Sequence, residues 1–228
     1  MLGCNAEVKQ QKGQLMFDAE QRWKKLWETR DVPSPRALLA YGRLRQAYGS
    51  SNRLYHNMGH IRHCLNVFDA ARNLTLYPDE VETAIWLHDV CYNVFSSCNE
   101  EDSVAWAQGM MKEFNVSDAF VKKVSGLIMA TKKHDGQLTD PDEQLVADID
   151  LSSLGVDWDA FWINTKDIER EYHHVDRATF ARERVKILQR FLDRALIYYT
   201  PELRVQYEKQ ARRNLTRSIT MLRERVAV

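Results

Sequence analysis

Apolar residues recur along this chain at intervals of three and four, and no stretch shows a sustained alternation of β-branched and polar residues. Phe17, Trp23, Leu26 and Trp27 form one such helical stripe, and a second runs through residues 180–196. Only nine Gly and five Pro are available to interrupt these stripes in 228 residues. The pattern predicts an all-α fold of about nine to ten helices.

Several helix ends can be read from local chemistry. Pro78 followed by Asp79 and Glu80 is a strong start signal, because proline suits the first turn and acidic side chains favour the positive end of a helix. Asn99 and Ser117 are expected to cap two further helices. Other helices are predicted over about 56–73, 143–153, 158–172 and from 200 onward, with a polar loop over 132–142.

The chain shows no internal repeat, low-complexity tract or linker, so a single domain over residues 1–228 is predicted, with residues 1–14 a candidate for disorder. A domain of this length buries ~70% of its unfolded surface and needs no disulfide to fold. The four cysteines lack a C-x-x-C spacing and are interpreted as reduced thiols. No signal peptide and no apolar run of about 18 residues is present. A cytoplasmic protein with no membrane partner is predicted.

The net charge narrows the range of possible functions further. Thirty-two basic and thirty-two acidic residues cancel, whereas a general nucleic-acid binder normally carries a basic excess. A local basic pocket for a phosphate remains compatible with this balance. The chemistry is therefore sought among the histidines and acids.

Three histidines lie within eight residues, and two of them, His56 and His60, share one helical face four residues apart. His63 lies nearly on the same face. An i, i+4 histidine pair can bind a metal ion directly. This cluster could therefore supply one ligand or two.

The dipeptide His88-Asp89 follows the helix that starts at Pro78. The dipeptide alone is a weak signal, because His134-Asp135 repeats it. Its position is more informative, since His88 falls on the face of Val81 and Ile85 that should point inward. A buried imidazole beside a buried carboxylate is costly unless a cation lies between them. The alternative is a core histidine beside an Asp89 salt bridge.

Two acids, Asp148 and Asp150, interrupt an otherwise apolar stretch. Acids in such a setting are more often ligands or caps than solvated charges. The order along the chain is therefore His, then His-Asp, then Asp.

In that order the chain resembles the HD-domain superfamily of metal-dependent phosphohydrolases, and more closely its small predicted members with no settled substrate. The resemblance runs from about Arg53 to Leu222 and is carried by the segments RLYHNMGHI, AIWLHDVCY, NEEDSVAWA, LIMATKKHD, ADIDLSSLG, IEREY and ARRNL. It implies that the metal ligands are His60, His88, Asp89 and either Asp150 or Asp148. Asp150-Leu-Ser resembles the metal segment of cyclic-nucleotide phosphodiesterases, which favours Asp150.

The resemblance also suggests less specific roles. His56 and His134 could bind a second metal or the substrate phosphate, with a solvated loop as the alternative for His134. Asp89 would bridge two metals if two are present, a nearby acid or His134 would move protons, and Glu100 would position the attacking water or serve as a helix cap. The candidate phosphate-binding residues are Arg53, Lys132, Lys133 and Arg170.

Mixed imidazole and carboxylate ligands suit one or two ions of Mn, Fe, Co, Ni or Zn, and Mg less well. Such an ion lowers the pKa of its water to about 7. The resemblance thus implies a hydrolase that cleaves a small phosphate mono- or diester, with a nucleotide as the expected substrate class. Three alternatives stay open: a metal- or nucleotide-binding regulatory protein without turnover, a di-iron oxygenase, and a purely structural helical domain.

Overall fold

The computed structural model describes residues 18–132 and 138–226. Within these ranges the chain forms ten α-helices and two short 3-10 helices and contains no strand, which confirms the all-α prediction. Contacts within the chain divide it after Arg43 into two units, which are described in turn. The single-domain prediction stays a prediction, and residues 1–14 lie outside the described ranges. None of the described helices is long and apolar enough to cross a membrane.

The first unit contains α2 (Ala19–Glu28) and the first ten residues of α3 (Ser34–Tyr48). Asp18 caps α2 by accepting a hydrogen bond from the backbone N–H of Gln21. The buried Trp23 donates its indole N–H to the carbonyl of Ala37 at 2.8 Å. This bond fixes α2 against the start of α3 and gives the indole nitrogen a partner away from water.

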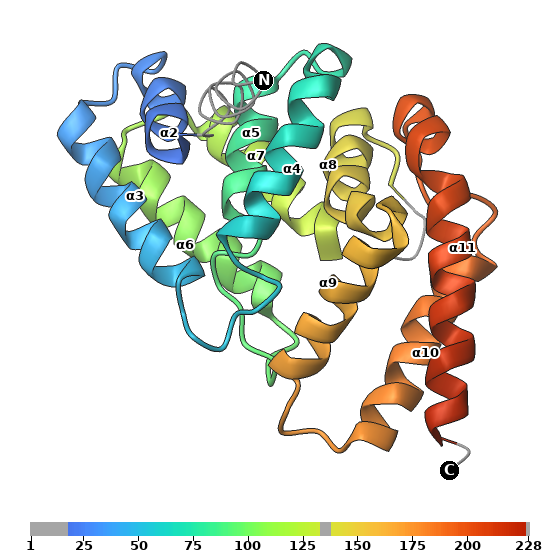
Figure 1. Ribbon diagram of the computed structural model, residues 1–228. Helices are drawn as coiled ribbons and strands as arrows, with labels where there is room; N and C mark the ends of the chain where they lie inside the picture. The colour runs from blue at the N-terminus through green and yellow to red at the C-terminus, as the bar shows by residue number, and fades with distance from the viewer. Residues whose placement is uncertain (1–17, 133–137, 227–228) are drawn as a thin grey trace, which may run out of the picture. The chain divides into compact units, whose positions relative to one another are not determined.

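The second unit begins within α3, and its first part contains α4 (Met58–Ala71), α5 (Pro78–Leu87), α6 (Asn99–Glu113), α7 (Asp118–Lys132) and α8 (Pro141–Leu151). Helix α7 contacts α5, α6 and α8 (Figure 1). Helix α4 packs on both α5 and α8. The packing brings the start of α4 and the ends of α5 and α8 together.

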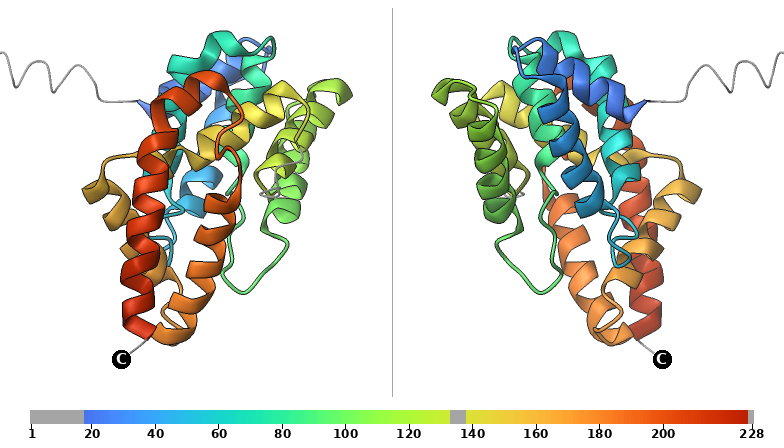
Figure 2. Two further views of the ribbon diagram at one scale, coloured as in Figure 1. Left: turned by 90° about the vertical axis from the view of Figure 1, so that its right-hand side faces the viewer. Right: turned by 90° about the vertical axis from the view of Figure 1, so that its left-hand side faces the viewer.

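The rest of the second unit is built on a helical hairpin of α10 (Arg177–Asp193) and α11 (Pro201–Val226), which lie side by side in Figures 1 and 2. The 3-10 helix η2 (Ser152–Gly155) continues from α8 and packs on α11, and α9 (Trp158–Glu171) follows it. The hairpin therefore lies against the segment that leaves α8.

One of the two predicted caps is correct. The Ser117 hydroxyl accepts a hydrogen bond from the backbone N–H of Phe120 at 3.3 Å and caps α7. The prediction for Asn99 is wrong, because its side chain reaches back to Asn93 and bonds both the N–H and the carbonyl of that residue. Asn99 thus closes the loop between α5 and α6 rather than capping α6.

Gly155 allows η2 to approach α11 closely. A Cβ atom on Gly155 would lie 2.6 Å from the Cβ and 2.8 Å from the carbonyl oxygen of Tyr207, so the helix backbone itself would have to move. We expect Gly155→Ala to lower the free energy of unfolding by about 1–3 kcal/mol, measured by urea denaturation.

Gly109→Ala is the matched control, because a Cβ there meets nothing within 4 Å and the residue lies inside α6. Its expected effect is a gain of about 0.5–1 kcal/mol. Equal effects of the two substitutions would contradict this account of η2 packing.

Candidate metal centre

Four predicted ligand residues meet where three helix ends converge. His60 lies in the first turn of α4, which Asn57 caps by accepting from the N–H of Gly59. His88 and Asp89 follow the last residue of α5, and Asp150 is the second-last residue of α8. Since α4 packs on α5 and α8, these three helix ends place their side chains in one region.

The distances between the ligand atoms are short and similar. His60 Nε2 lies 3.2 Å from His88 Nε2, 3.1 Å from Asp150 Oδ1 and 3.7 Å from Asp89 Oδ2. His88 Nε2 lies 3.3 Å from Asp89 Oδ2 and 3.4 Å from Asp150 Oδ1. The two imidazoles are buried and the two carboxylates are half-buried.

These separations fit a single divalent ion. With metal–ligand distances of about 2.0–2.2 Å, neighbouring donor atoms on one ion lie about 3–3.6 Å apart. Among the described residues, His60, His88 and Asp89 form one possible ligand group, whose donor atoms all lie within 4.8 Å of one another, and Asp150 shares His60 with a second group. Mixed nitrogen and oxygen donors suit a divalent transition metal, as the sequence indicated.

Hydrogen bonding orients one of the ligands. His88 Nδ1 lies 3.0 Å from the carbonyl oxygen of Ile85, so Nδ1–H donates and Nε2 faces the cluster. An outer partner of this kind selects the tautomer that coordinates a metal.

The electrostatics of the cluster favour a cation at its centre. Burial disfavours the charged form of His88, but the neighbouring Asp89 and Asp150 carboxylates outweigh burial and raise the pKa of the imidazole. Burial likewise opposes ionisation of both carboxyls, yet the His88 and His60 imidazoles hold their pKa values below the ordinary range. A bound metal ion would displace the proton of the His88 imidazole, so the affinity of the site for the metal should rise with pH.

Only one of the two neighbouring acids of α8 joins the cluster. Asp148 is fully buried and accepts hydrogen bonds from the backbone N–H groups of Tyr199 and Thr200, just before α11. Burial raises the pKa of Asp148 to about 6, and the two backbone bonds oppose this shift. Asp148 therefore joins α8 to the start of α11, while Asp150 faces the histidines.

Cys64 is a further candidate ligand that the sequence reasoning did not select. Its Sγ lies 3.7 Å from His60 Nε2, and His60, Cys64 and Asp150 form a second possible ligand group. Burial and the nearby carboxylates raise the pKa of this thiol. The sequence feature that could have identified Cys64 as a candidate ligand is its i, i+4 spacing from His60.

The three histidines at the start of α4 have different partners. His63 Nε2 lies 2.8 Å from the Ser152 hydroxyl, and burial lowers the pKa of this imidazole to about 4. His56 Nδ1 lies 2.7 Å from a carboxylate oxygen of Glu171, and its ring stacks on Tyr92 at 4.0 Å. Only His60 of the three belongs to the possible ligand groups found among the described residues.

Glu171 is a buried acid at the end of α9. In the sequence it was included only as part of the segment IEREY, without a role of its own. Its carboxylate also accepts from the backbone N–H groups of Tyr55 and His56, at 2.8 and 3.0 Å. It therefore fixes the chain just before α4 and the orientation of the His56 ring. No local pattern distinguishes this acid from its neighbour Glu169.

Glu171→Gln tests this role through pH. Burial raises the pKa of Glu171, but the bonds from His56 and Tyr55 outweigh burial and lower it. Because the folded pKa is depressed, the carboxylate stabilises the fold above the ordinary pKa, and this contribution is lost as pH falls through the folded value. We expect Glu171→Gln to cost about 1–2 kcal/mol at pH 7 and progressively less below about pH 4.5, measured by urea denaturation. A pH-independent difference would contradict this assignment.

The predicted phosphate-binding residues lie in different places. The Arg53 guanidinium donates to the carbonyl oxygens of Asp89 and Val90, at 2.7 and 3.0 Å. Arg53 therefore supports the backbone at the candidate metal ligand Asp89. Lys132 pairs with Glu101 at 2.6 Å and donates to the Ser97 carbonyl. Lys133 and His134 lie outside the described residues.

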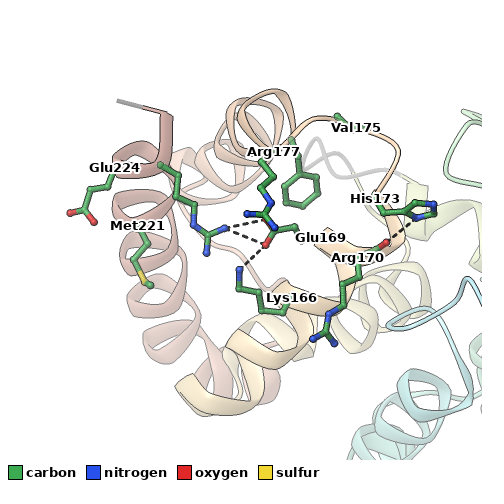
Figure 3. A pocket seen from close by; sticks show the side chains of 10 residues that line it. Lys166, Glu169, Arg170, His173, Val175, Arg177, Met221 and Glu224 are labelled. Atoms are coloured by element: carbon green, nitrogen blue, oxygen red, sulfur yellow. Dashed lines mark hydrogen bonds and ion pairs between the residues drawn. The ribbon is translucent and has the colours of Figure 1, made fainter. Parts of the chain in front are cut away.

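Arg170 lines a pocket formed by α9, α10 and α11, with a volume of about 1010 Å³ (Figure 3). Its guanidinium is exposed and pairs with Asp167 at 3.0 Å. Glu169 pairs with Lys166 of the same helix and with Arg225 of α11. The four clustered ligand residues do not line it.

A second cavity, of about 550 Å³, lies directly beside the candidate metal centre. Asp150, His56 and Glu100 line one part of it. Apolar and aromatic side chains from η2, the segment after α9 and α10 line the rest. Its volume is typical of a site for a small organic molecule.

Comparisons with protein families, with curated proteins and with solved structures found no match to this chain. The assignment of a function therefore depends on the site itself.

Proposed function

We propose that this chain is a metal-dependent phosphohydrolase of the HD type that cleaves a phosphate mono- or diester, with a nucleotide as the substrate class. The observation that carries the proposal is the convergence of His60, His88, Asp89 and Asp150 beside a cavity for an organic molecule, with the histidine nitrogens 3.1–3.7 Å from each other and from the carboxylate oxygens. The order of these residues along the chain matches the HD pattern.

The four ligand residues would bind a divalent ion of Mn, Fe, Co, Ni or Zn, with Mg less well matched to two imidazoles. Such an ion supplies a Lewis acid that polarises a phosphoryl oxygen and activates water.

The chain itself supplies groups for proton transfer. His56 lines the cavity, and Glu171 accepts its Nδ1–H, so that in the doubly protonated imidazolium the opposite Nε2–H can protonate the oxygen of a leaving group. Glu100 lines the same cavity and offers a carboxylate to accept a proton from the attacking water.

The proposal is tested by metal analysis of the purified protein followed by assays of p-nitrophenyl phosphate, bis(p-nitrophenyl) phosphate and a nucleotide panel with the metal that is found. We expect about one or two ions per chain and metal-dependent turnover. Metal occupancy without turnover of any ester would favour the regulatory alternative. Absence of metal after incubation with Mn²⁺ or Ni²⁺ would reject the proposal.

His56→Asn separates proton transfer from metal binding. The variant should retain its metal, because His56 is outside the ligand cluster, and should lose about 10²–10⁴-fold in turnover. Loss of one metal equivalent would instead make His56 a ligand, as first predicted.

A further inference from the structure

One cation in the cavity beside Asp150 has no counterion. Arg184 of α10 lines this cavity and is half-buried, and its Nε is closed off from solvent without a hydrogen-bond partner. Glu100, Asp150 and Glu183 also line the cavity, but within residues 18–132 and 138–226 no carboxylate forms an ion pair with its guanidinium. A partly buried, unpaired charge is costly to the fold unless a ligand satisfies it.

The surroundings of Arg184 point toward the candidate metal centre. Tyr55, Tyr92 and Tyr172 line the same cavity as the guanidinium. The Tyr55 ring lies 5.0 Å from the His60 ring, and the Tyr92 ring stacks on His56. Two tyrosines of this cavity therefore lie against the candidate ligand His60 and the neighbouring His56.

Most of the remaining wall of the cavity is apolar, although Thr179 and the exposed Glu183 of α10 also line it. Phe180 and Leu188 lie one helical turn on either side of Arg184 on α10, and both are buried. Leu154 of η2 and Ile168 of α9 add aliphatic surface from other elements. A charged fork set in apolar and aromatic walls is suited to an anion that carries a hydrophobic or planar organic group.

We infer that Arg184 binds the anionic group of the substrate and that the apolar part of the same cavity receives its organic group. The inference rests on the proposed function only for the identity of the anion as a phosphate. It defines the substrate as an organic phosphate with a planar or apolar group, in contrast to inorganic phosphate or a small hydrophilic ester.

The test measures binding of phenylphosphonate and methylphosphonate by calorimetry, because these probes share one dianion and differ in the organic group. Both are titrated into Mn²⁺-loaded and chelator-treated protein. The variants are Arg184→Met and Arg184→Lys, with Arg190→Met as the matched control on the exposed face of α10.

We expect phenylphosphonate to bind about tenfold or more tightly than methylphosphonate. Arg184→Met should weaken both by about 10- to 100-fold, with and without Mn²⁺, while Arg184→Lys retains part of the affinity and Arg190→Met retains all of it. Arg184→Met should also unfold at a higher urea concentration than the wild type, because an unpaired charge is removed. A structural arginine would give the opposite shift.

Two results would overturn the inference: unchanged phenylphosphonate affinity in Arg184→Met, or equal affinity of the wild type for the two probes. These failures are distinct from failure of the proposed function. A chain that binds no metal but still binds phenylphosphonate through Arg184 would lack the proposed activity and retain the subsite.

Discussion

His88→Ala is expected to abolish metal binding at the cluster and, with it, any metal-dependent hydrolysis. The imidazole contributes a donor atom 3.2–3.4 Å from the donors of His60, Asp89 and Asp150, so its loss leaves an incomplete coordination sphere. Loss of an outer partner alone typically costs 10- to 100-fold in metal affinity, and loss of a direct ligand should exceed about 100-fold. Metal content by elemental analysis and affinity by chelator competition measure the effect.

His63→Ala is the matched control for this result. His63 lies on α4 close to the cluster, but its ring bonds the Ser152 hydroxyl and is absent from the possible ligand groups of the described residues. Its replacement should leave the metal stoichiometry unchanged. A His88→Ala variant that retains a full metal equivalent would show that the cluster is not the binding site.

The second large effect is expected from a comparison of Asp150→Asn with Asp148→Asn. Asp150→Asn replaces an anionic ligand by a neutral amide, so metal affinity should fall by more than about 100-fold. Asp148→Asn should keep its metal and lose stability through an unsatisfied buried donor instead. Its new amide N–H₂ would face a backbone N–H of Tyr199 or Thr200 and leave a buried donor without an acceptor.

An unsatisfied donor of this kind costs about 1–3 kcal/mol, which urea denaturation of the metal-free protein would detect. Asp148→Asn should keep its metal equivalent when measured under conditions where it is folded. Loss of metal from Asp148→Asn with retention in Asp150→Asn would exchange the roles assigned to the two acids.

Much of the local structure was determined by the sequence. The periodic apolar stripes and signals such as Pro78-Asp79-Glu80 are local properties of a helix, and α5 begins at Pro78 as predicted. The types of residue at the candidate centre could also be predicted, since a buried histidine next to an aspartate indicates a compensating cation. Asn99 shows the limit of local signals, because its side chain found a partner six residues away instead of the helix end.

The tertiary structure alone decided which candidates meet. Asp148 and Asp150 lie two residues apart and so point about 200° apart around α8, one toward the segment before α11 and one toward His60. Glu171 carries no signature in the sequence, because its partners Tyr55 and His56 lie more than one hundred residues away. Arg184 carries none either, because its cavity is completed by residues of distant segments such as Tyr92. Helical periodicity tells which face of a helix is buried, whereas the packing of distant helices determines what that face contacts.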